Sequence, residues 1–584
     1  MASKAASKKR TKASASTKTN QTAQQAANHP TIIPPDVRAA PDGIFPGAHE
    51  YGDGLVRWAI YAPGKQSISV IGDWNNWERN ADPLFVTTEG LWWTERTLEP
   101  GRYAYKFWID GQQELGDPYA TELADEAGGG QPAAVVNVGK TPYSWFDGGW
   151  APPPWNDLVI YELHIGDFAA PFNFQSVIER LPYLQDLGIN AIELMPVAEF
   201  AFRGWGYNPG YFLCPETSYG TPDEFRLLVD MAHQHGIAII LDEVFAHTAH
   251  DHPFNQLYPY DQSPWYGVSL GEQNQFGFPS LDHAKPATQN FLRDVQTWWL
   301  QEYHIDGFRY DYTLGIGYDA QNGVTRLVAD ARAVRPNAYL IAEQSPELPQ
   351  MVAATKLNGA WHVRFNYMLK ALLREGSYMD WDGDNFAQLT EVLSPAAQGY
   401  DDQAAMVNYL ESHDETRVVF EVASAEHLDE GAARYKSALG AICLFTAPGV
   451  PMILHGQEWG EATTKTTEPN PLHWELLNDA GGSGLHAQYR RLIRLRRDRR
   501  PLRMAGFAVL ASDNAAKTIV YARWDETDDQ IVVALNFSPS EQTLMVPFPY
   551  AARWLDVLTD EVLEVDGPTS VVIGSSHGRV FVRG

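Results

Sequence analysis

Between about residues 155 and 500, short apolar runs alternate with longer segments whose apolar residues recur at helical spacing. Eight runs have the length of buried strands: DLVIYELHI, INAIELMPV, IAIILDEVFAH, IDGFRYDY, AYLIAEQ, GAWHVRFN, AAMVNYLESHD and VPMILHGQE. Helical patterns such as PDEFRLLVDMAHQHG, which closes on a glycine, separate them. This alternation predicts an α/β fold, a parallel (β/α)8 TIM barrel over residues 150–503. A doubly wound sheet is disfavoured because no glycine-rich phosphate loop follows the first strand.

Short strand patterns bounded by turn residues flank this middle part. Residues 46–145 contain LVRWAIYAP, SISVIGDWNNW, LWWTERTL and GRYAYKFWIDG, which predict a small N-terminal β-sandwich. Packing between the sheets and a sugar-binding face are equal interpretations for four of its tryptophans, Trp74, Trp77, Trp92 and Trp93. Residues 504–584 predict a C-terminal antiparallel β-domain that caps the barrel. Residues 1–45 are too polar to bury a core, and they predict a disordered basic tail.

Charge limits the partners that this chain can take. The formal net charge is −29, and residues 1–35 hold six basic residues and no acid, so the rest carries −35. Such a surface disfavours nucleic acid and anionic membranes, whereas a neutral polymer is not repelled. The sequence has no apolar run long enough for a membrane span and no signal-peptide core, so we expect a cytoplasmic protein. Cys214 and Cys443 are expected to be reduced thiols, and the oligomeric state stays open.

Polar side chains gather where the predicted strands end. These residues are Asp242 and His247 on the third strand, Arg309 and Asp311 on the fourth, Glu343 on the fifth, and His413 and Asp414 on the seventh. A single aspartate at a strand end usually caps the next helix. Four carboxylates, two histidines and an arginine meeting at the C-terminal face of a barrel would be costly unless they formed a site.

The same residues carry a resemblance to the α-amylase superfamily of glycoside hydrolases and transglycosylases. LDEVFAH resembles its first signature, DGFRYD the second, IAEQ the third and LESHDE the fourth. The segment RGWGYNPGYFLCPETSYGTPDEF resembles the stretch that places a tyrosine, here Tyr207, beneath the reactive sugar. The resemblance covers roughly residues 50 to 584, because GDWNNW and YAYKFWIDG are similar to a sugar-binding module that precedes the barrel in several branches.

The resemblance implies a role for each residue. Asp311 would attack the anomeric carbon, and Glu343 would protonate the leaving oxygen and then activate the acceptor, as in retaining enzymes. Asp414 would bind sugar hydroxyls and help to distort the ring. Four more residues would support these three carboxylates. Arg309 would keep Asp311 ionised, and Asp242 would orient Arg309. His247 and His413 would donate hydrogen bonds to the same sugar.

One departure bears on metals. The first signature usually carries an asparagine before its histidine, which helps to hold calcium in many α-amylases; here the residue is Ala246. We therefore expect no required metal and no cofactor.

Hydrolysis is the main prediction for the reaction, and several alternatives stay open. The stretch NPLHWELL after the eighth strand favours hydrolysis of α-1,4-glucosidic bonds in starch or glycogen. A short excursion after the third strand and the segment GYFLCPETSYGTPDEF favour the alternative, a 1,4-α-glucan branching enzyme. Trehalose-releasing hydrolysis and a non-catalytic glucan-binding protein complete the set.

Overall fold

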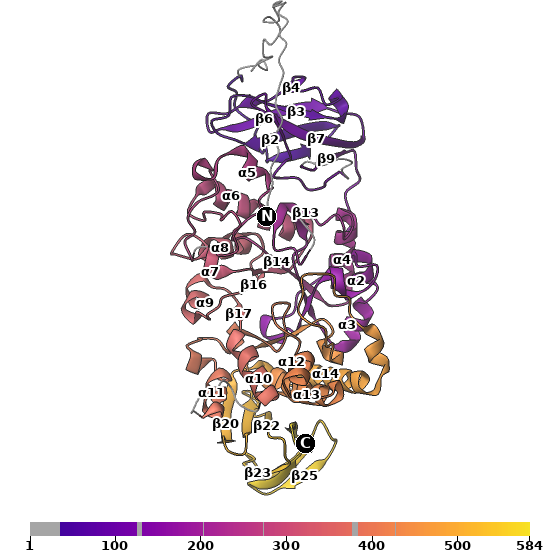
Figure 1. Cartoon of the computed structure of the whole chain (residues 1–584), viewed down its shortest axis with the longest axis vertical. Helices are drawn as coiled ribbons and strands as arrows, with labels where there is room; N and C mark the ends of the chain where they lie inside the picture. The colour runs from indigo at the N-terminus through magenta and orange to yellow at the C-terminus, as the bar shows by residue number, and fades with distance from the viewer. Residues whose placement is uncertain (1–34, 125–130, 202–203, 273, 376–383, 427) are drawn as a thin grey trace, which may run out of the picture.

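The computed structural model describes residues 35–124, 131–201, 204–272, 274–375, 384–426 and 428–584. Three parts follow one another along its long axis, an N-terminal β-domain, a barrel and a C-terminal β-domain at the opposite end (Figure 1). Most of the predicted basic tail lies outside the described residues. Its last residues pair with the first domain, since the Arg38 amide donates to the Val86 carbonyl at 2.9 Å. In the described part of the chain, no helix is both long and apolar enough to cross a membrane.

The N-terminal domain packs two antiparallel sheets face to face. One sheet has the order β1 (Gly47–Glu50), β2 (Leu55–Tyr61), β6 (Leu91–Thr97) and β5 (Phe85–Val86). The other joins β4 (Asp82–Pro83), β3 (Ile68–Gly72), β7 (Gly101–Ile109) and β8 (Gln113–Leu115), and β9 (Ala134–Val138) pairs with β7.

The four tryptophans of this domain divide between its core and its surface. Trp92 and Trp93 are buried, and Trp74 packs on the buried ring of Trp58 with 4.7 Å between centroids. Trp77 is 37% exposed. Packing therefore accounts for the first three, and Trp77 alone of the four keeps a ring open to a ligand.

Eight parallel strands close the barrel in chain order, which confirms the predicted fold class. The strands are β10 (Ile160–Leu163), β11 (Ala191–Leu194), β14 (Ala238–Glu243), β15 (Gly307–Tyr310), β16 (Tyr339–Ala342), β17 (Gly359–Trp361), β18 (Met406–Tyr409) and β19 (Val450–Leu454). The pattern GAWHVRFN is strand only as far as Trp361, because α10 (Val363–Glu375) begins two residues later.

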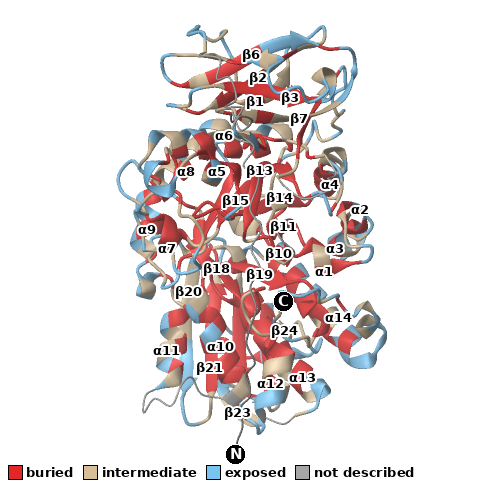
Figure 2. Cartoon of the chain, turned by 45° about the horizontal axis from the view of Figure 1, so that its top comes forward, coloured by how far each residue is buried: buried red, intermediate tan, exposed pale blue. Residues whose placement is uncertain are grey.

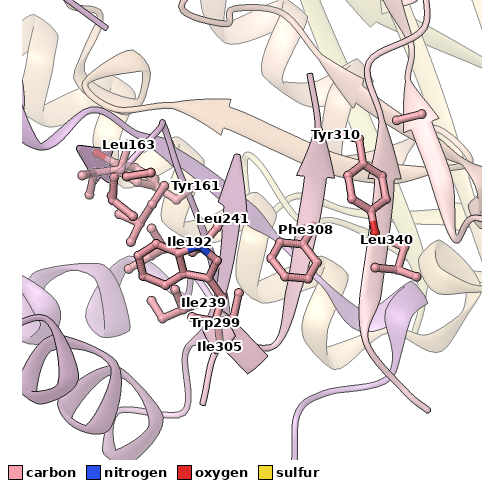
Figure 3. Close-up of a cluster of buried hydrophobic side chains, with 14 of the residues drawn as sticks. Tyr161, Leu163, Ile192, Ile239, Leu241, Trp299, Ile305, Phe308, Tyr310 and Leu340 are labelled. Atoms are coloured by element: carbon pink, nitrogen blue, oxygen red, sulfur yellow. The ribbon is translucent and has the colours of Figure 1, made fainter. Parts of the chain in front are cut away.

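Side chains of the barrel strands alternate between two cores, as period-two geometry requires. Inward residues such as Ile160, Ile240 and Ile341 fill the barrel. Outward residues such as Ile192, Ile239 and Phe308 pack against the surrounding helices, including Trp299 of α6 (Pro286–Glu302), as Figure 3 shows. The strands accordingly form a continuous buried layer inside the helices (Figure 2).

Local sequence explains how the first helical segment is shaped. The pattern FQSVIERLPYLQDLG forms α2 (Phe174–Ile178) and α3 (Leu181–Leu187) rather than one helix, because Pro182 stands in the first turn of α3. Gly188 ends α3 in the left-handed conformation, at φ 102°.

The C-terminal domain is antiparallel, as predicted. A six-stranded sheet has the order β20 (Gly506–Asp513), β21 (Thr518–Trp524), β22 (Gln530–Asn536), β27 (His577–Arg583), β24 (Ala552–Asp556) and β25 (Val562–Val565). A second sheet pairs β23 (Gln542–Val546) with β26 (Thr569–Ile573). The buried Arg523 ties the first sheet to the barrel by donating to the carbonyl of Thr446, at the end of α13 (Glu430–Thr446), at 2.8 Å.

Candidate active site

The predicted site residues lie at the C-terminal ends of the barrel strands. Asp242 is the fifth residue of β14, and Arg309 lies opposite it on β15 in the parallel register. Asp311 follows β15 directly and Glu343 follows β16. All four positions share the inward parity of Ile240 and Ile341, so strand geometry aims their side chains at the barrel axis.

Arg309 is the centre of this group. One terminal nitrogen, Nη1, donates to Asp242 at 2.7 Å and to Asp311 at 2.9 Å. The other, Nη2, forms an ion pair with Glu343 at 3.0 Å. The guanidinium is fully buried and lies over the ring of Trp361, 4.3 Å from its centroid. A rigid, planar cation thus holds the three carboxylates in a fixed arrangement, and the predicted orienting role of Asp242 agrees with these contacts.

Several neighbouring groups act on the pKa of Asp311. Burial raises the pKa of Asp311 well above its usual range, and the Glu343 carboxylate raises it further, while Arg309 lowers it. One guanidinium faces three carboxylates, so the ionisation of Asp311 by Arg309 alone stays a prediction.

Glu343 is positioned by a second contact. The backbone N–H of Tyr312 donates to Glu343 Oε2 at 2.8 Å, and Tyr312 has the left-handed conformation with φ 46°. This unusual conformation follows directly after Asp311 and turns the chain so that its amide meets the neighbouring carboxylate. The carboxyl group of Glu343 is still 22% exposed, so it remains open to a ligand.

The rings of Tyr207 and His413 lie beside these carboxylates. Their rings stack with centroids 5.0 Å apart, and the Tyr207 hydroxyl donates to Asp242 at 2.5 Å. Asp414 reaches further out, with 42% of its side chain exposed. Lys465, from the loop after β19, donates to the Asp414 carbonyl and lies 3.5 Å from its carboxylate.

His247 is close to this group but is oriented by the backbone. Its Nε2 bonds the Tyr207 carbonyl at 2.9 Å, and its ring stacks on Phe278 with 4.9 Å between centroids. Burial lowers the pKa of His247, so the ring is neutral. A carbonyl only accepts, so Nε2 carries the hydrogen and Nδ1 is left as an acceptor. Nδ1 is buried and has no hydrogen-bond partner among the described residues, and the donation from His247 to a sugar stays a prediction.

A cleft lies beside His413, whose ring contacts Asp414. Its inner part is lined by His413, Lys465 and Trp205, and by His164 and Asp167. The last two residues also line a neighbouring hollow of about 410 Å³. Three aromatic residues line that hollow: the partly exposed Phe172 and Phe200, and the buried Tyr219. Such a channel, with aromatic walls and a few polar groups, suits an extended polyhydroxylated ligand.

Three residues of the site were not predicted from the sequence: Glu162, Trp361 and Lys465. Glu162 accepts from His413 Nδ1 at 2.6 Å, and its signal is a carboxylate at an inward position of a barrel strand, where apolar residues are the rule. Trp361 had no signal apart from its place at the end of a strand. Lys465 had none, because its position depends on how the loop after β19 folds back.

Metal binding has no support from side-chain clusters. Among the residues that the structure describes, no group of three or more His, Cys, Asp or Glu side chains is arranged to hold a metal ion.

Comparisons with known proteins agree with this geometry. Residues 166–266 and 253–508 match the model of the alpha amylase catalytic domain, and residues 509–582 match the alpha amylase C-terminal all-beta domain. Residues 46–120 match carbohydrate-binding module 48, the isoamylase N-terminal domain. The chain belongs to the α-amylase family, and it is an enzyme of that type, a retaining glycoside hydrolase or transglycosylase.

Individual relatives are similar over most of the chain. The 1,4-alpha-glucan branching enzyme GlgB of Corynebacterium jeikeium is 28% identical over 578 residues, which cover 89% of this chain and 78% of that protein. GlgB of Mycobacterium tuberculosis H37Rv is 27% identical over 583 residues, with 89% and 76% covered. Among solved structures, pullulanase from Anoxybacillus sp. LM18-11 complexed with maltotetraose has a TM-score of 0.78 at 20% identity, covering 93% of this chain and 88% of that chain. Type I pullulanase from Bacillus subtilis has a TM-score of 0.76 at 20% identity, with 92% and 85% covered. These two structures establish likeness of fold alone.

Proposed function

We propose that this protein is a 1,4-α-glucan branching enzyme. The observation that carries its chemistry is the placement of Asp311 and Glu343 on the two terminal nitrogens of one buried guanidinium. Two close carboxylates are what a double displacement at an anomeric carbon needs. Branching is favoured over other reactions of the family because the two similar sequences described above are both named as branching enzymes.

The reaction would proceed in two balanced steps. Asp311 attacks the anomeric carbon of an α-1,4-linked glucose, and Glu343 gives its proton to the departing O4, which leaves as the free end of a glucan. A β-glycosyl ester on Asp311 and an ionised Glu343 remain. Glu343 then takes the proton from a 6-hydroxyl of an acceptor chain, whose oxygen displaces Asp311 and forms an α-1,6 bond. Asp414 and His413 would hold the hydroxyls of the transferred sugar.

Hydrolysis, which the sequence analysis preferred, has less support. Its main indication was the stretch NPLHWELL, and Trp474 in that stretch serves packing. Its indole donates to the Phe168 carbonyl at 2.6 Å, and its ring lies 4.8 Å from that of Trp459. His473 pairs with Glu461 at 3.0 Å. These contacts hold the loop after β19 in place, which a hydrolase and a transferase need equally.

The same proposal covers substrate and location. The substrate would be a neutral α-glucan, for which the acidic surface is no obstacle. The exposed Trp77 of the N-terminal domain would offer the chain a stacking surface away from the catalytic centre. A cytoplasmic location suits two buried free thiols, Cys214 and Cys443.

Incubation with amylose tests the proposal, with new α-1,6 linkages and new reducing ends followed together. We expect branches to accumulate with few net reducing ends. The variant Asp311→Asn should lose activity by about 10³-fold or more, because the amide cannot form the ester. Asp401→Asn, a change at an exposed carboxylate on the same barrel, is the matched control and should behave as wild type. Reducing ends that rise without branches would replace branching by hydrolysis.

A further inference from the structure

Both ring nitrogens of His413 face carboxylates. Nδ1 lies 2.6 Å from Glu162 Oε1, and Nε2 lies 3.3 Å from Asp414 Oδ2. The backbone N–H of His413 also points at the two Glu162 oxygens, at 3.4 and 3.3 Å. Glu162 thus holds this residue through its ring and through its main chain.

Only one protonation state of the ring satisfies this arrangement. A neutral imidazole has one N–H, so it would leave a lone pair directed at one of the two carboxylates. The imidazolium donates from both nitrogens. The ring of Tyr207 stacks on the His413 ring, and the ring of Trp205 lies roughly perpendicular to it.

The position of Glu162 separates it from the substrate. It is the third residue of β10, paired in register with Glu193 on one side and Leu454 on the other, and it is 1% exposed. Its backbone carbonyl accepts from the His455 amide at 3.0 Å, which fixes the strand at this point. A ligand in the cleft therefore meets His413 and Asp414, and Glu162 lies behind them.

We infer that Glu162 is a positioning residue that keeps His413 in the imidazolium form, with its Nε2–H presented to Asp414 and to the sugar held there. This inference rests on the proposed function, since it assigns the sugar-binding role to Asp414 and His413. In the free enzyme the charged ring keeps Asp414 ionised and oriented. With a glucan bound, the same N–H is available to a sugar hydroxyl.

The charged groups around His413 determine its pKa. Burial lowers its pKa, Asp414 and Glu162 raise it, and Arg309 lowers it, so that the pKa of His413 lies at about 9. Asp242 is linked to the ring as well, since His413 lowers the pKa of that carboxyl group. Removal of the Glu162 charge should reduce the pKa of His413 by about 1–3 units, the usual effect of a close counter-charge.

The test compares Glu162→Gln, which keeps shape but removes the charge, with Glu162→Asp, which keeps the charge. Glu458→Gln is the matched control, since Glu458 is a fully buried carboxyl group that accepts from Tyr161 and Tyr183. The ionisation of His413 is followed by NMR of the protein labelled with ¹³C at histidine Cε1. Its resonance is identified as the one that is missing in His413→Gln.

The expected result is a His413 titration near pH 9 in wild type and in Glu458→Gln, lower by about 1–3 pH units in Glu162→Gln, and partly restored in Glu162→Asp. Amylose-modifying activity should follow, with Glu162→Gln about 5- to 500-fold below wild type at pH 9 and close to it below pH 6. An unmoved His413 titration in folded Glu162→Gln overturns the inference. The titration needs no turnover, so the inference can fail while branching holds, and branching can fail while the shift is observed.

Discussion

Removal of the charge of Arg309 is the perturbation that tests the site most directly. This side chain touches the three carboxylates Asp242, Asp311 and Glu343, at 2.7, 2.9 and 3.0 Å. Arg309→Gln removes the charge and keeps one hydrogen-bonding group. Arg309→Lys keeps the charge and loses the planar fork, because an ammonium group cannot match several carboxylates at once.

The size of the effect follows from these distances. Two unit charges about 4 Å apart interact by about 4 kcal/mol at an effective dielectric constant near 20, which corresponds to about 3 pKa units. Measured shifts of carboxylates beside an arginine are about 1–3 units. Arg309 lowers the pKa of Asp311 against burial and against Glu343. Its loss should raise that pKa by the same 1–3 units.

This shift in the pKa of Asp311 can be measured from a pH–rate profile. Asp311 attacks only when ionised, so a higher pKa moves the acidic limb of kcat/KM to higher pH, by about 1–3 units in Arg309→Gln. Arg309→Lys should keep the limb near its wild-type position with a lower plateau, because the charge remains while the carboxylates are held less firmly. Circular dichroism must confirm that both variants are folded. An acidic limb at the wild-type pH in folded Arg309→Gln would refute the electrostatic role.

Three further outcomes are expected. Burial raises the pKa of Glu458 from 4.5 to about 7, so the stability linked to it is complete below pH 4.5 and is lost as the pH rises through 7. Glu458→Gln should therefore gain about 3 kcal/mol over wild type between pH 4.5 and pH 8 in urea unfolding. Trp77→Ala should weaken sedimentation with insoluble amylose by about tenfold and leave turnover of short maltooligosaccharides unchanged. Tyr207→Phe removes the hydroxyl that donates to Asp242 and should lower kcat/KM by about 10- to 100-fold without unfolding, measured on the same maltooligosaccharides.

The barrel could be predicted because its strands are buried on both faces. Ile160 and Ile240 face one core while Ile192 and Phe308 face the other, so the strands are mainly apolar runs. Polar residues stand out against such runs where the strands end. Asp311 and Glu343 were therefore identifiable before their contacts were known.

Other features could not be predicted from the sequence, because they depend on how distant segments come together in the fold. Glu162 and His413 are 251 positions apart in sequence, and their pairing arises only when β10 and β18 take their places in the closed barrel. The raised pKa of Asp311 likewise required the number of neighbouring charges and the depth of burial. Lys465 reaches Asp414 through a loop whose course no short motif encodes.

The inside of the barrel mouth holds more acid than two cations can neutralise. Arg309 and His413 face six carboxyl groups, those of Glu162, Glu193, Asp242, Asp311, Glu343 and Asp414. Burial raises the pKa of Glu193 well above its usual range, so that group keeps its proton. Protons retained in this way limit the cost of placing so many acids together. Under the proposed function, the remaining negative charge would provide a favourable environment for the positively charged, oxocarbenium-like transition state.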